Sequence, residues 1–209
     1  MKNAKDSKEL KSIKKIKEIC QDISLDKLET FIKRPGTVKK SAIELQKKFE
    51  NKTKVSIIVG DLDYARLHFT AHFNDSDATQ FIHSEEKNNQ NLWPTPLEKE
   101  GLDNFMREFV NQTTAGLKQV LETTGQCIPA FSLPIITRSS DAIFFQINED
   151  FDKTLTIKDC WNLTLNHSSI TCQVHFEIYD TTLFFNAVEK AKYERNSFVE
   201  DVFINTNFA

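Results

Sequence analysis

Glycine is scarce in this chain of 209 residues, and its scarcity excludes several classes of function. Only five glycines are present, far below the usual ~7% of residues. They are Gly36, Gly60, Gly101, Gly116 and Gly125. Their spacing matches neither the G-x-G-x-x-G pattern of dinucleotide-binding loops nor the G-x-x-x-x-G-K-[ST] pattern of P-loops. The sequence therefore argues against nucleotide-cradling loops of either kind.

Cysteine and long apolar runs are also sparse. The four cysteines, Cys20, Cys127, Cys160 and Cys172, form no C-x-x-C pair, which favours reduced, mostly buried thiols over a disulfide framework or a zinc site. No apolar run approaches the ~18 residues of a membrane span, and the Lys-rich first 18 residues lack the apolar region of a signal peptide. We therefore expect a cytoplasmic protein that binds no membrane.

Charge is distributed unevenly along the chain. Residues 1–54 hold 16 Lys and Arg against 8 Asp and Glu, whereas residues 55–209 hold 11 against 22. A basic segment could bind nucleic acid or an anionic membrane, but lysines interleaved with acidic residues are more often a solvated helix face. We expect a solvated face and no nucleic-acid partner. The predicted organisation is a basic helical segment (1–50), an α+β domain (51–180) and a C-terminal helix and tail (181–209).

Hydrophobic periodicity predicts the secondary structure. Apolar residues recur every three or four positions from Leu10 to Ile32, which predicts an amphipathic helix interrupted around residues 34–36, and a second short helix is expected over Ser41–Phe49. Another helix is expected from Leu183 to Arg195. Alternating apolar residues predict strands over 55–59, 67–73, 143–147, 155–157, 163–165 and 170–178, the first two joined by a turn at 60–63. The pattern predicts an α+β fold with a mainly antiparallel sheet packed against long helices, and helical extensions at both ends.

One long helix carries the candidate chemistry. Thr95, Pro96 and Glu98 form a capping-box start, and Gly125 is a plausible stop. At 100° per residue, the apolar residues between Leu102 and Val120 share one face. Asn104, Glu108, Asn111 and Ala115 fall on the opposite face, with Gly116 next to Ala115. This helix therefore presents a carboxylate and a carboxamide one turn apart, away from its core face.

This helix and its surroundings resemble the CheC/CheX/FliY group of chemotaxis phosphatases. The resemblance rests on Glu108-x-x-Asn111, on the segment that runs through Gly116 and Lys118, and on the Ser132-Leu133-Pro134 sequence that leads into a strand. Ile58-Val59-Gly60-Asp61 and the strand after it resemble the family's early hairpin. A single Glu-x-x-Asn copy is similar to CheX rather than to the two-site CheC layout. The resemblance spans roughly residues 50–180.

The resemblance implies a function and a mechanism. CheX-like proteins are cytoplasmic homodimers that hydrolyse the aspartyl phosphate of a CheY-like response regulator, which itself supplies the phosphorylated Asp, Mg²⁺ and a Lys. By this analogy Asn111 orients the attacking water and Glu108 docks on the receiver Lys, while Asn104, Ala115 and Lys118 belong to the partner-binding surface. The chain itself then needs no cofactor or metal. A carboxamide suits the task because it both donates and accepts hydrogen bonds without repelling the phosphoryl group.

Two positions depart from the family pattern. Asn104 stands where relatives often carry Asp or Ser, and Ala115 stands where they often carry Gly, with Gly116 one position late. The alternative is therefore a non-catalytic CheX-like scaffold that binds a response regulator or a flagellar switch component.

Other candidate sites are weaker. His68 and His72 are four apart, but their segment alternates as a strand, so they are expected on its polar face together with His175 of the last strand, and not as a metal pair. Ser139 is followed by Ser and Asp, but no G-x-S-x-G elbow precedes it, so no nucleophilic triad is expected.

Overall fold

A computed structural model describes residues 2–43, 52–83, 96–122, 130–139 and 155–193. These residues form an antiparallel sheet of seven strands in the order β1-β6-β7-β3-β2-β4, with β5 also paired to β2. The strands are β1 (Lys39–Ala42), β2 (Lys54–Leu62), β3 (Ala65–Phe73), β4 (Ala130–Phe131), β5 (Ile135–Arg138), β6 (Leu155–Leu165) and β7 (Ser168–Ile178). The helices are α1 (Lys2–Phe31), α2 (Asp75–His83), α3 (Pro96–Leu121) and α4 (Thr181–Lys190). The α+β class with an antiparallel sheet is confirmed.

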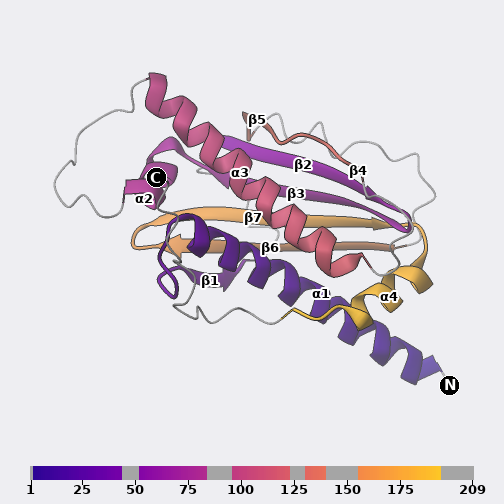
Figure 1. Cartoon of the computed structure of the whole chain (residues 1–209). Helices are drawn as coiled ribbons and strands as arrows, with labels where there is room; N and C mark the ends of the chain where they lie inside the picture. The colour runs from indigo at the N-terminus through magenta and orange to yellow at the C-terminus, as the bar shows by residue number, and fades with distance from the viewer. Residues whose placement is uncertain (1, 44–51, 84–95, 123–129, 140–154, 194–209) are drawn as a thin grey trace, which may run out of the picture.

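The two long helices cover one face of the sheet. Figure 1 shows α1 and α3 side by side across the strands, with α2 and α4 near opposite ends of the sheet. The core lies between the helices and the sheet and contains aromatic side chains from both layers, among them Phe69, Phe109, Trp161 and Phe176, all fully buried. Residues of α1 belong to the same hydrophobic cluster as residues of β2, β3, β6 and β7. The basic N-terminal segment therefore contributes to the main core.

The central strands agree with the periodicity of the sequence. The hairpin of β2 and β3 is confirmed, with its turn at Asp63 and Tyr64, slightly later than predicted. The predicted strand over 170–178 is β7. The predicted strands over 155–157 and 163–165 are the two ends of one continuous strand, β6. The predicted strand over 143–147 lies outside the described residues.

The N-terminal helix is confirmed, with one correction after it. The chain leaves the helix near the expected interruption. The φ angle is positive at two residues there, 54° at Lys33 and 74° at Gly36. Ile16 and Ile23 on the apolar stripe are fully buried, whereas Leu10 is 66% exposed because the stripe extends beyond the core. The helix predicted over Ser41–Phe49 is wrong at its start: residues 41 and 42 belong to β1, which hydrogen-bonds to β6. Pairing to an edge of the sheet overrides the local helical pattern there, and residues 44–49 lie outside the described residues.

The C-terminal helix is shorter than predicted. The Asp180 side chain accepts a hydrogen bond from the Leu183 backbone N–H and so caps α4 at its start, two residues before the predicted helix begins. The helix ends at Lys190, and the chain continues without regular structure through Tyr193. Cys20, Cys160 and Cys172 are buried free thiols, as predicted, and Cys127 lies outside the described residues.

Because Gly60 of β2 has no side chain, the aromatic ring of Phe131 can pack directly against its backbone. Gly60 pairs with Phe131 of β4, and a Cβ atom at residue 60 would come within 2.1 Å of the Phe131 ring. Beside this pair, the Ser132 backbone N–H donates to the Val59 carbonyl at 2.8 Å, and the Val59 N–H donates to Ser132 Oγ at 3.0 Å. The Ser132-Leu133-Pro134 segment is therefore tied to β2 and leads into β5.

Candidate functional site

The candidate site lies on helix α3, whose buried face is as predicted. The helix begins at Pro96 and ends at Leu121, while Thr95 and Gly125, the predicted cap and stop, lie outside the described residues. Its fully or nearly fully buried residues include Leu102, Met106, Phe109, Val110, Thr113 and Leu117. The core face therefore runs the length of the helix and fixes its rotation about its own axis.

Two polar contacts anchor α3 near its ends. Near its start, Lys54 of β2 forms an ion pair with Asp103 at 2.9 Å and with Asp75 of α2 at 2.7 Å. At its end, the Tyr64 hydroxyl donates to the Leu121 carbonyl at 2.7 Å. This carbonyl is one of the last four of the helix, which have no partner within it. The helix is held at both ends as well as along its core face.

The opposite face of α3 presents the predicted site residues. Asn104, Asn111 and Ala115 are exposed, and Glu108 and Lys118 are half-buried. Glu108 and Asn111 are three residues apart and therefore neighbours on the helix surface. The structure thus places the carboxylate and the carboxamide together on the solvent-facing side of a fixed helix.

Two further residues of α3, Gln112 and Arg107, contact the predicted site residues, and neither was predicted from the sequence. Gln112 Nε2 donates a hydrogen bond to Glu108 Oε1 at 2.6 Å. Arg107 Nη1 donates to Asn104 Oδ1 at 3.3 Å. The spacings of three and four residues are the ones at which helical side chains meet, so this rule applied to every polar residue of the helix would have found both pairs.

Gly116 has a different role from the one that the sequence suggested. It lies not on the solvent-facing side with Ala115 but at the crossing of α3 and α1. A Cβ atom at residue 116 would lie 2.9 Å from Cγ2 of Ile23 and 3.4 Å from Cε of Lys27. About three turns towards the start of α3, the rings of Phe105 and Phe31 form a second contact between the two helices and pack edge to face with centroids 5.7 Å apart. Gly116 therefore sets how closely α1 approaches the flank of α3 that carries Glu108 and Gln112.

The side chains of His68, His72 and His175 lie on the face of the sheet away from α3, as predicted. His68 and His175 are paired across β3 and β7 and stack with ring centroids 5.4 Å apart. Glu177 is 3.9 Å from His68 Nε2, and burial lowers the pKa of His68 below 6.5. Among the described residues, no three His, Cys, Asp or Glu side chains gather as metal ligands would.

The buried His72 contacts Ser139, the serine for which the sequence predicted no nucleophilic triad. His72 Nδ1 lies 3.3 Å from Ser139 Oγ, but the Ser139 hydroxyl donates to the Lys54 carbonyl at 3.0 Å. On its other side, His72 Nε2 lies 3.4 Å from Thr70 Oγ1. Burial, and then the charge of Lys52, lower the pKa of His72 to about 4. The Ser139 hydroxyl proton points to the Lys54 carbonyl and not to His72.

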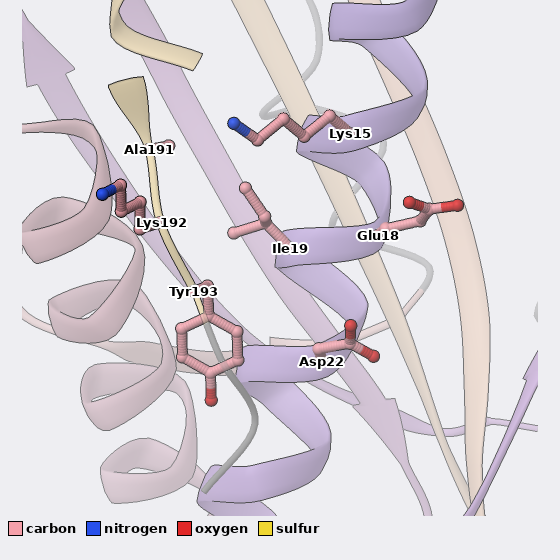
Figure 2. Close-up of a pocket in the computed structure, with 7 residues that line it drawn as sticks. All are labelled: Lys15, Glu18, Ile19, Asp22, Ala191, Lys192 and Tyr193. Atoms are coloured by element: carbon pink, nitrogen blue, oxygen red, sulfur yellow. The ribbon is translucent and has the colours of Figure 1, made fainter. Parts of the chain in front are cut away.

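A shallow pocket of about 290 Å³ lies between α1 and the segment that follows α4. Figure 2 shows its lining, with Ile19 between the charged side chains of Lys15, Glu18 and Asp22, and the Tyr193 ring opposite them. The pocket shares no residue with the Glu108 and Asn111 surface. In the part of the chain that the structure describes, no helix combines the length and apolar character that a membrane span requires.

Comparison with known proteins finds similar structures, but no family model or curated protein with a similar sequence. A CheC-like superfamily protein from Shewanella sp. PV-4 has a similar structure, with a TM-score of 0.51 and 13% identity over 78% of this chain and 97% of that one. A chemotactic CheC-like protein from Shewanella oneidensis MR-1 gives a TM-score of 0.50 and 13% identity over 78% and 98%. The CheX–CheY–BeF3–Mg²⁺ complex from Borrelia burgdorferi gives a TM-score of 0.47 and 12% identity over 78% and 97%. The two CheC-like structures, with TM-scores of 0.51 and 0.50, show that the chain has the CheC-like α+β fold predicted from the sequence.

Proposed function

We propose that this chain is a chemotaxis-type protein phosphatase of two-component signalling, which hydrolyses the aspartyl phosphate of a CheY-like response regulator. One observation carries the proposal: Asn111 is exposed beside Glu108 on the solvent-facing side of α3. The helix is held by its buried face and by the contacts of Lys54 and Tyr64 near its two ends. Because positioning is most of what a catalyst of phosphoryl transfer must supply, a carboxamide on a fixed helix suits the reaction.

In the proposed reaction, Asn111 enters the phosphorylation site of the receiver and holds a water in line with the phosphorus–oxygen bond to be broken. The water oxygen bonds to phosphorus while the bond between phosphorus and the aspartyl oxygen breaks. Inorganic phosphate leaves with the oxygen of the water, the water's protons go to the phosphate and to solvent, and the receiver aspartate is regenerated as a carboxylate. The amide of Asn111 can accept from and donate to the water without adding charge near the phosphoryl oxygens. Glu108 pairs with the receiver Lys and fixes the docking geometry. The Mg²⁺ ion belongs to the receiver, so no cofactor of this chain is involved.

The experiment compares phosphate release from a phosphorylated CheY-like receiver with and without this protein. The receiver is phosphorylated by a small phosphodonor in the presence of Mg²⁺, the donor is removed, and release is followed over time. We expect the wild-type chain to accelerate release and Asn111→Ala to remove the acceleration. Gln119→Ala is a matched control because Gln119 is another exposed carboxamide on α3. Equal activity of Asn111→Ala and wild type would contradict the assignment of the site.

The alternative is a non-catalytic scaffold that binds a response regulator or a flagellar switch component. The observation that favours it is the pair of departures on the same surface: Asn104 holds Arg107 through its side-chain oxygen, and the Ala115 methyl group is exposed. A scaffold would bind the activated receiver without accelerating phosphate release. The same assay, combined with a binding measurement, separates the two functions.

Further expectations accompany the proposal. We propose that Asn104, Ala115 and Lys118 contact the partner, that the protein is a cytoplasmic homodimer joined by sheet edges, and that it binds neither nucleic acid nor membranes. In support of a solvated basic face, Lys8 pairs with Glu189 at 2.8 Å, and Lys40 pairs with Asp22. Light scattering at several concentrations tests the dimer, and steeply salt-dependent binding to DNA or RNA would contradict the last expectation.

A further inference from the structure

Near its middle, the solvent-facing side of α3 carries a cation and an anion on opposite flanks of a neutral strip. Lys118 lies on the same flank as the cation, about three turns further along the helix. At about 100° per residue, Asn104, Asn111 and Ala115 lie along the middle of this side. Arg107 lies on one flank and Glu108 on the other, about 100° apart around the helix. The Glu108 flank is the one that faces α1, where Gly116 meets Ile23. Consistent with this arrangement, Arg107 is exposed and Glu108 is half-buried.

Each of the two charges is held by a neutral carboxamide. Gln112 donates to the Glu108 carboxylate at 2.6 Å, and Asn104 accepts from the Arg107 guanidinium at 3.3 Å. Neither charge forms an ion pair within the described residues. An amide restricts the side chain without cancelling its charge, whereas an Asp at residue 104 would give Arg107 a counter-charge at the (i, i+3) spacing. Both charges therefore remain available to a partner.

We propose that Arg107 is a second docking residue, which engages anionic oxygens of the receiver's acidic phosphorylation site while Glu108 engages the receiver Lys. This inference rests on the proposed function. A partner that fits this surface must present a cation and an anion on either side of the point where Asn111 enters. The planar guanidinium matches the oxygen pairs of a carboxylate or a phosphoryl group, with which it forms two parallel hydrogen bonds. Arg107 and Glu108 together then fix the direction in which the receiver docks.

The test measures the affinity of the full chain for a CheY-like receiver with Mg²⁺, in the presence and absence of beryllofluoride as a phosphoryl mimic. We expect Arg107→Gln to raise Kd about threefold to tenfold and to flatten its dependence on salt, as for other charges at the edge of an interface. Lys158→Gln is the control, because Lys158 is exposed on β6, on the face of the sheet away from α3. This control should change Kd by less than about twofold.

The two receiver states distinguish which anion Arg107 contacts. If the contact is to the phosphoryl group, Arg107→Gln weakens binding only when beryllofluoride is present. If the contact is to a receiver carboxylate, the variant weakens binding in both states. Either result supports the inference.

A second variant separates docking from a structural role. Asn104→Asp keeps the arginine but neutralises it, so we expect it to weaken binding about as much as Arg107→Gln. In the Arg107→Gln background, Asn104→Asp should weaken binding less than it does in the wild type, so the two substitutions should couple in a double-mutant cycle. If wild type binds the activated receiver and Arg107→Gln binds equally well, Arg107 has no docking role and the proposed function stands. If wild type does not bind the activated receiver, the proposed function is wrong and the inference falls with it.

Discussion

The close contact between α1 and α3 at Gly116 leads to a quantitative prediction for the stability of the protein. The same substitution, glycine to alanine, can be made at Gly116 and at Gly101 of α3, so the two variants can be compared directly. Replacing a glycine by alanine in a helix interior usually stabilises the protein by about 0.5–1 kcal/mol, since alanine loses less backbone entropy on folding. At Gly101 nothing lies within 4 Å of the added methyl group, so Gly101→Ala should show this gain in full.

At Gly116 the same methyl group would lie 2.9 Å from Ile23 Cγ2. Ile23 is fully buried, and its Cγ2 is attached to the stiff β-branched carbon, so it cannot move away without shifting α1 or the core. Forcing an extra methyl group into a packed interior costs about 1–3 kcal/mol. This cost outweighs the gain, so we expect Gly116→Ala to be less stable than Gly101→Ala by about 1–3 kcal/mol.

The measurement is urea unfolding of the wild type and both variants, with the free energy of unfolding obtained by linear extrapolation. Ile23→Leu provides an internal check, because leucine has no methyl group at the Cγ2 position. In that background Gly116→Ala should recover most of its loss, so the two substitutions should couple in a double-mutant cycle. If Gly116→Ala stabilises the wild-type protein as much as Gly101→Ala does, the close approach of α1 and α3 is wrong.

Three further predictions concern Tyr64, His72 and Gln112. Tyr64→Phe removes the hydroxyl that donates to the Leu121 carbonyl and should cost about 1 kcal/mol in urea unfolding. Burial, and then the charge of Asp63, raise the pKa of Tyr64 to about 12. Between pH 10 and 12 only the unfolded Tyr64 loses its proton, so the wild type should lose stability with rising pH more steeply than Tyr64→Phe; parallel curves would contradict this. For His72, with its pKa lowered to about 4, the neutral form is favoured in the folded state, so stability should fall as the pH drops from 6.5 to 4, by up to about 3 kcal/mol. His72→Gln should flatten this acid limb in pH-dependent thermal unfolding, and an unchanged limb would show that His72 does not contribute. Gln112→Met removes the donor to Glu108 at similar volume and should raise KM for the phosphorylated receiver about threefold at unchanged kcat, whereas Gln119→Met should change neither constant.

The sequence predicted those elements whose own hydrophobic pattern is long and regular. The alternation of β2, β3 and β7 and the apolar stripe of α3 each extend over many residues, because one face of each element is buried. The same stripe placed Asn111 on the exposed side of α3, as the structure has it. Burial therefore sets a period that can be seen in the sequence alone.

Shorter elements depend on contacts that are distant in the chain. Strands β1, β4 and β5 have four, two and four residues, and the nine-residue helix α2 was not predicted at all. The edge strands form because they pair with β6 or β2, and α2 is held partly by the pair of Lys52 with Asp77 at 2.7 Å. Four or fewer residues are too few to show a period, so periodicity does not indicate these strands. Only β5 was anticipated, through the resemblance, which places a strand after Pro134.

The roles of Gly116 and Gln112 could not be assigned for a similar reason. Gly116 appeared beside Ala115 in the sequence, but which flank of α3 meets α1 depends on how the two helices cross. Gln112 gains meaning only from its hydrogen bond to Glu108. Pairwise contacts between side chains are decided by packing and rotamers, which composition and periodicity do not contain.

The proposed function depends on Asn111 orienting a water molecule for attack on an aspartyl phosphate. It is tested most directly by single-turnover decay of a phosphorylated CheY-like receiver mixed with excess wild-type protein, Asn111→Ala or Gln119→Ala. Wild type and Gln119→Ala should shorten the lifetime of the phosphoryl group to the same extent, and Asn111→Ala should leave it at the receiver's own rate of decay. If wild type binds the receiver but does not shorten that lifetime, the protein is not a phosphatase.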